Sequence, residues 1–209
     1  QLSDPDKTKR AGALNSIARD PEASLLAPLR ASIEGEADAD ILARKTRLER
    51  LMSMAYDSDV PTRVGAINDM SGDLSVDFRA TLNPILSTTR VVMPAGEMPD
   101  GNVAQEVIPG SATLTRAAAY ELLVAAGDAP AKVTQDARDA ALEANVEGGR
   151  VAGVPVAQLS SETARDETYD RLVTQGLAVP RVSGDDVDAR LEAYRFYDVY
   201  AEPSADVTQ

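Results

Sequence analysis

The sequence has no cysteine, no histidine and no tryptophan among its 209 residues. Without cysteine the chain forms no disulfide bond and offers no thiol nucleophile. Without histidine it has no imidazole base, which excludes a Ser-His-Asp triad, and the zinc sites built from cysteine and histidine are excluded as well. We therefore expect no metal site and no cofactor in this chain.

Aromatic residues, cationic residues and long apolar runs are also scarce. Aromatic residues make up only 4% of the chain, so its core must be aliphatic and rich in alanine. There are 21 Lys and Arg against 34 Asp and Glu, and the resulting net charge of −13 disfavours binding to nucleic acid or anionic lipid. No apolar run approaches the roughly 18 residues that a membrane span needs, so we expect no direct membrane insertion of this segment.

The sequence motifs of common enzyme classes are absent too. The four lysines, at positions 7, 9, 45 and 132, lie outside any Ser-x-x-Lys motif. There is no Gly-x-Ser-x-Gly motif, phosphate-binding loop or dinucleotide fingerprint. Carboxylate pairs remain a catalytic option, because 34 acidic residues allow many combinations. We expect the chain not to be an enzyme, and a hydrolase that uses paired carboxylates stays open as an alternative.

One stretch of the sequence occurs twice in related form. DPDKTKRAGALNS at residues 4–16 matches DSDVPTRVGAIND at residues 57–69 in its aspartates, its arginine and its apolar positions. In each copy an aspartate precedes apolar residues at helical spacing, so Asp4 and Asp57 are the predicted N-caps. A turn and a second apolar stripe follow each helix, which predicts two helical hairpins. Paired helices with capping aspartates and a linking arginine resemble HEAT-like repeats.

The rest of the chain predicts further helices and a few short strands. Four helices are expected from apolar spacing, at residues 38–55, 115–126, 134–145 and 160–175, and a fifth at 184–200. Residues 89–113 are predicted to form two short strands or an ordered loop, and Gly148-Gly149 to turn a small hairpin.

The predicted fold is mainly α, with degenerate HEAT-like helical hairpins and a small irregular or β-hairpin insertion. Residues 1–88 are predicted to hold the hairpins and the linker helix between them. Residues 89–209 are predicted to hold the loop insertion and further helices, packed as one continuous domain with the first part.

Aspartates in an Asp-x-Asp pattern occur at residues 4 and 6, 38 and 40, and 57 and 59. Alternating carboxylates are found in divalent-metal sites, but none of these pairs has the glycine and glutamate spacing of a calcium loop. Each pair stands where a helix is predicted to begin, and capping accounts for it there. We interpret the pairs as helix caps.

Two groups of residues are candidate partner contacts. Tyr194 and Tyr197 are predicted to share one face of the last helix, where tyrosine favours an interface. The alternative is that these aromatic residues cover the core. Asp57, Asp59, Asp73 and Asp77 are predicted near the rim of a contact face on the hairpins, and the alternative is that they only solvate the surface.

Four segments together resemble a known family, the urea-type ABC transporter permeases of bacteria within the branched-chain amino-acid permease family. The resemblance is to the extracytoplasmic N-terminal region of these proteins, and the segments that carry it are residues 57–86, 115–130, 145–159 and 195–208. It implies a HEAT-like helical region that follows a signal sequence and precedes the membrane-spanning helices. It implies no catalytic residue, since other subunits hydrolyse ATP.

The resemblance also implies a location and partners. The chain would lie on the periplasmic side of the inner membrane as part of a membrane protein, in contact with a solute-binding protein and the membrane domain of the permease. Gln1 in place of methionine, and a helix start at Glu202-Pro203 near the end, lead us to expect a processed piece of a longer protein. A free-standing acidic helical-repeat adaptor for protein–protein interaction is the alternative.

Overall fold

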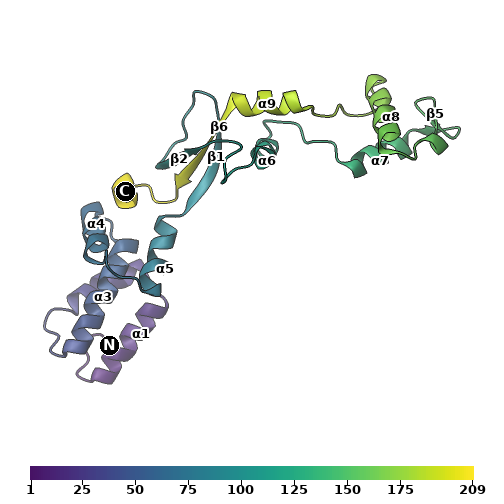
Figure 1. Cartoon of the computed structure of the whole chain (residues 1–209). Helices are drawn as coiled ribbons and strands as arrows, with labels where there is room; N and C mark the ends of the chain where they lie inside the picture. Colours follow the sequence, from purple (N-terminus) through teal and green to yellow (C-terminus); the bar gives the residue numbers. More distant parts are fainter. The chain divides into compact units, whose positions relative to one another are not determined.

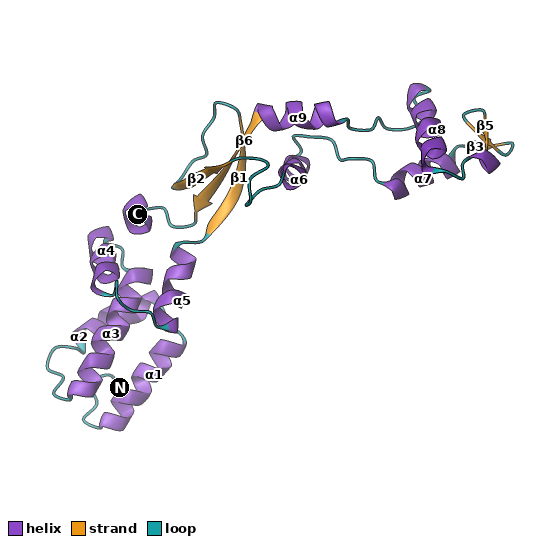
Figure 2. Ribbon diagram, in the orientation of Figure 1, coloured by secondary structure: helices purple, strands orange, loops and turns teal.

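The computed structural model describes residues 1–209, and the chain is mainly helical, with 53% of its residues in helices. Ten helices accompany two small antiparallel sheets of three strands each (Figure 2). The predicted mainly α class is confirmed, whereas no repeat is identified. None of the helices is long and apolar enough to cross a lipid bilayer.

The chain divides into two compact units, each built from separate stretches of sequence. The first unit comprises Gln1–Val91, Pro99–Gln105 and Tyr197–Gln209, and the second comprises Val92–Met98 and Glu106–Phe196. The last residues of the chain therefore belong with the first helices.

The first unit is a set of helices packed on α3 (Figure 1). Its helical elements are α1 (Lys7–Arg19), the 3-10 turn η1 (Ala23–Leu25), α2 (Leu26–Ala31), α3 (Ala39–Tyr56), α4 (Val60–Asp69), α5 (Val76–Ile85) and α10 (Ala205–Thr208). Helices α1, α2, α4 and α5 each contact α3, and α10 contacts α4. One apolar cluster lies between α1, α2 and α3, and a second lies between α3, α4, α5 and α10. The helix predicted at residues 38–55 is therefore the common support of this unit.

Aspartates of the repeated stretch do cap helices, but the capping residue in each copy lies two positions later than predicted. Asp6 caps α1 by accepting a hydrogen bond from the Thr8 amide, and Asp59 caps α4 through the Thr62 amide. The predicted caps Asp4 and Asp57 instead accept hydrogen bonds from the amides of Asp6 and Asp59, at 2.9 and 2.8 Å. The correction has a local cause, because an aspartate can close a turn onto the amide two residues ahead and so delay the helix.

The second unit contains four helices and one of the sheets. Its elements are α6 (Arg116–Ala126), α7 (Gln135–Ala144), β3 (Val146–Glu147), β4 (Arg150–Val151), β5 (Val154–Pro155), the 3-10 turn η2 (Val156–Gln158), α8 (Glu162–Thr174) and α9 (Gly184–Ala193). Helix α6 packs on α9, and α7 packs on α8. Gly148 and Gly149 turn the β3–β4 hairpin with positive φ angles, as expected of a tight primed turn.

The remaining sheet has the strand order β1-β6-β2, with β1 at Thr88–Pro94, β2 at Val103–Val107 and β6 at Tyr194–Tyr200. Of the two alternatives predicted for residues 89–113, two strands or an ordered loop, the structure has the two strands. The single helix predicted over residues 184–200 is wrong, because it ends at Ala193 and the aromatic segment YRFYDVY continues as the central strand. Aromatic and β-branched side chains favour a strand once partners lie on both sides, and here they do.

Candidate functional site: an apolar groove on α3

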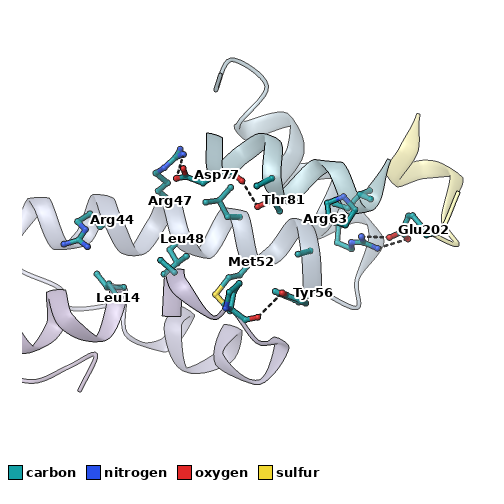
Figure 3. A pocket seen from close by; sticks show the side chains of 18 residues that line it. Leu14, Arg44, Arg47, Leu48, Met52, Tyr56, Arg63, Asp77, Thr81 and Glu202 are labelled. Carbon is teal, nitrogen blue, oxygen red and sulfur yellow. Dashed lines mark hydrogen bonds and ion pairs between the residues drawn. The ribbon is translucent and has the colours of Figure 1, made fainter. Parts of the chain in front are cut away.

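An open groove of about 800 Å³ runs along one face of α3 in the first unit (Figure 3). Its floor is the α3 stripe of residues 44, 47, 48, 51, 52, 55 and 56. These positions recur every three or four residues, so they share one face of the helix. The last position is twelve steps along the helix from the first, and at 1.5 Å per step the floor is about 18 Å long.

Helices α1 and α5 form the two walls of the groove. Leu14 and Ala18 face it from α1, and Ala80, Pro84 and Ile85 face it from α5. Most of these wall residues are small or unbranched, as is Ala55 on the floor. The groove therefore has mostly small side chains on its walls and larger apolar side chains, such as Leu48, along its floor.

Arg47 lies at one end of the groove and gathers two carboxylates from the α4–α5 connection and the start of α5. It forms ion pairs with Asp73 and Asp77, the latter at 3.2 Å, and donates a 2.7 Å hydrogen bond to the Ser75 hydroxyl. The hydrogen bond from Arg47 lowers the pKa of Asp73 to about 2. This cluster ties the N-terminus of α5 to α3 and so fixes that wall.

Arg44 lies at the same end but has no carboxylate partner. Its guanidinium donates one hydrogen bond, of 2.6 Å, to the side-chain oxygen of Asn15 on α1. The residue is exposed to solvent and lines the groove (Figure 3). It is therefore a cation whose charge is not neutralised within the chain.

The opposite end of the groove is closed by a buried ion pair. Both Nη atoms of Arg63 reach the Glu202 carboxylate, at 2.8 and 2.6 Å (Figure 3). Arg63 Nε donates to the Met54 carbonyl at 2.9 Å. Only about a tenth of each charged side chain is exposed, 10% and 9%. Arg63 holds the pKa of Glu202 below its ordinary value. This two-pronged contact attaches the end of the chain to α4.

The predicted contact residues are placed in different environments. Asp57 has only 8% of its side chain exposed, and its pKa is lowered by the Asp59 amide and by Arg30. Asp59 is exposed at the start of α4, and Asp73 is held by Arg47. Of the four acids only Asp77 lines the groove, with 66% of its side chain exposed. The structure thus brings Asp73 and Asp77 together and separates both from Asp57.

The two predicted contact tyrosines lie on β6 rather than on a helix. Tyr194 is half-buried against the apolar cluster of the second unit, and burial raises the pKa of its hydroxyl. Tyr197 has 6% of its surface exposed. Successive side chains of a strand point to opposite faces of the sheet. Tyr194 and Tyr197 are three positions apart, so they lie on opposite faces of β6 and do not share one face as the helix prediction required.

The sequence did not predict that Arg44, Arg47 and Arg63 frame a groove, although Arg63 stands out as the arginine of the repeated stretch. Arg63 and Arg10 occupy the same place in the repeated stretch, and each pairs with a buried glutamate. Arg10 meets Glu36 at 3.1 Å, and Lys45 adds a second ion pair to Glu36 at 2.9 Å. The arginine that occurs in both copies was therefore the available signal for these ion pairs. An arginine next to apolar residues that pack in a core needs a carboxylate partner there.

The charged side chains of the groove are mostly held in ion pairs. Both of its carboxylates, Asp77 and Glu202, are held by arginines. No group of three or more acidic side chains is placed to hold a metal ion. Comparison with known protein families, with curated proteins and with solved structures found no match.

Proposed function

We propose that this chain is the periplasmic domain of an ABC importer permease for urea or branched-chain amino acids, with a docking or bracing role and no catalysis. The observation that carries the proposal is the preformed apolar groove on α3, whose walls are fixed by the Arg47 cluster and the Arg63–Glu202 pair. A preformed apolar surface with a small number of placed polar groups suits recognition of another molecule. The resemblance of four sequence segments to such permeases supplies the transport context.

We extend the proposal to the architecture of the first unit. The two copies of the repeated stretch would be degenerate HEAT-like hairpins that share α3 as their support. The equivalent arginines Arg10 and Arg63 support this, because each joins the leading helix of its copy to a glutamate outside that helix, Glu36 and Glu202 respectively. Such a linking arginine is what the repeat interpretation requires.

The partners in this proposal are the solute-binding protein and the membrane domain of the same importer. The chain carries a net charge of −13, and Asp59 and Asp77 are exposed on the first unit. A partner that approaches this surface should present basic residues, and the association should weaken as salt screens the charges. The interface is expected to be modest in area, since a docking step must be reversible.

The test is a titration of the full chain with the solute-binding protein encoded beside it, at low and high salt, with and without urea. We expect saturable binding at low salt that weakens at least several-fold at high salt. Absence of binding at low salt under both conditions would end the docking role and leave bracing. If the gene encodes no membrane-spanning runs of about 20 apolar residues, the free-standing adaptor replaces the importer.

A further inference from the structure

We propose that the groove on α3 is the acceptor site for an amphipathic helix of a partner protein, about three turns long, that carries a carboxylate at the end beside Arg44. This inference rests on the proposed docking function and names the element that docks. Three properties of the groove support it: its shape, the size of its lining residues and its charge.

The shape of the groove matches a helix. Its floor is a single helical stripe about 18 Å long, and its walls are two helices that both contact α3. A helix laid between α1 and α5 would pack against all three, as the fourth member of a four-helix arrangement. Twelve to thirteen residues of helix would span the floor.

The size of the lining residues permits close packing. Packed helices approach to 8–10 Å between axes, and the smaller distances require small side chains at the contact. Ala18 on α1, Ala55 on α3 and Ala80 on α5 supply them on all three sides. Leu48, which is half-buried, lies beside these positions and would contact the apolar stripe of the incoming helix (Figure 3).

The charge of the groove identifies the polar end of the partner helix. Three arginines and two carboxylates line it, and Asp73 adds a third carboxylate beside Arg47, so the positive and negative charges are equal in number. Arg47 and Arg63 are neutralised by ion pairs, whereas Arg44 has only the Asn15 amide oxygen. A carboxylate on the incoming helix would give Arg44 the charge-assisted hydrogen bonds that it lacks.

The experiment uses a displayed library of 16-residue amphipathic helices, selected against the full chain. Selected helices should share an apolar stripe at i, i+3, i+4 and i+7 and an acidic residue near one end. Ala80→Phe fills the groove with a ring and should weaken their binding at least tenfold. Arg44→Gln should weaken it about tenfold, the size expected for a hydrogen bond to a charged group. Replacing the acidic residue of the peptide should weaken binding by the same factor as Arg44→Gln. The two changes together should weaken it no further, because they remove the same interaction.

Matched variants control for surface and folding effects. Arg79→Gln removes the same charge as Arg44→Gln, and Asn83→Phe introduces the same ring as Ala80→Phe. Both control residues are exposed on α5 outside the groove lining, and both variants should leave binding unchanged. Helices that bind wild type and Ala80→Phe equally would overturn the site. Insensitivity to Arg44→Gln would overturn the carboxylate. Saturable binding of sodium laurate in the absence of any selected helix would show that the groove binds a small amphiphile instead. Self-association of the chain that Ala80→Phe abolishes would show that the occupant is a second copy of the chain.

The same variants separate this inference from the proposed function. If the solute-binding protein binds but ignores Ala80→Phe and Arg44→Gln, the docking role stands and the helix-acceptor site fails. If helices bind the groove as described while neither the solute-binding protein nor the permease membrane domain binds, the acceptor site stands and the importer role fails.

Discussion

Charged side chains inside the first unit are each neutralised by a neighbour of opposite sign. Lys45 has 1% of its side chain exposed and lies 2.9 Å from Glu36, and Arg63 is similarly enclosed with Glu202. Removal of one partner from such a pair leaves a desolvated charge, which costs more than the intact pair contributes. These pairs therefore fix where helices lie even where they add little net stability.

Glu202→Gln tests this at the pair that closes the groove. The variant leaves the Arg63 guanidinium buried without a counter-charge, and we expect a loss of about 3 kcal/mol in the free energy of unfolding, measured by urea denaturation of the full chain. Glu97→Gln, at an exposed glutamate without an ion pair, is the control and should change the free energy by less than about 0.5 kcal/mol. Equal effects of the two variants would show that the pair is not buried in solution.

The Asp73 carboxyl gives a pH prediction at the same scale. Its pKa is about 2 in the folded chain and 3.8 in the absence of neighbours, because Arg47 stabilises the charged form. The contribution of Asp73 to stability is therefore present above pH 3.8 and is lost as the pH falls through 2. Carboxyl ¹³C titration by NMR should give a midpoint near 2 for Asp73, and Arg47→Gln should raise it toward 3.8. A wild-type midpoint at 3.8 or above would contradict the ion pair.

At the scale of elements, local patterns predicted what depends on local contacts. The apolar spacing of residues 38–55 gave α3, and the Gly148-Gly149 pair gave the β3–β4 turn. The helix prediction for residues 194–200 was wrong, because these residues form a strand only by pairing with β1 and β2, which lie far away in the sequence. The groove could not be predicted, because the apolar spacing of α3 does not show which of its residues are buried, like Met52, and which stay partly exposed, like Leu48. Of the residues predicted as partner contacts, only Asp77 lines the groove.

The caps of the repeated stretch carry the element-scale prediction. Asp59→Ala removes the carboxylate that accepts from the Thr62 amide at 3.0 Å and should destabilise α4 by about 1 kcal/mol. Ser58→Ala changes the exposed residue beside it and serves as control. Thermal unfolding followed by circular dichroism would measure both. A Ser58→Ala effect as large as that of Asp59→Ala would show that Asp59 is not the cap.

At the scale of the whole molecule, stability is distributed over separate apolar clusters. Met54 belongs to the cluster of α3, α4, α5 and α10, which also contains Val207 near the end of the chain. Leu123 belongs to the cluster of α6, α9 and the adjoining strand residues in the second unit. Each cluster is made by residues distant in sequence, so each unit forms only when its separate stretches of chain have met.

This division predicts that the two units respond separately to a cavity. Met54 and Leu123 have no exposed surface, and truncation of either to alanine should cost about 2–5 kcal/mol. Met54→Ala should speed amide hydrogen exchange in α4, α5 and α10 and leave α6 and α9 unchanged, because local opening draws on the stability of the cluster concerned. Leu123→Ala should give the reverse pattern, so each variant controls for the other. Faster exchange in both sets of helices from a single truncation would show that the chain unfolds as one cooperative body, and the last residues would then be bound to the fold as a whole rather than to the first unit.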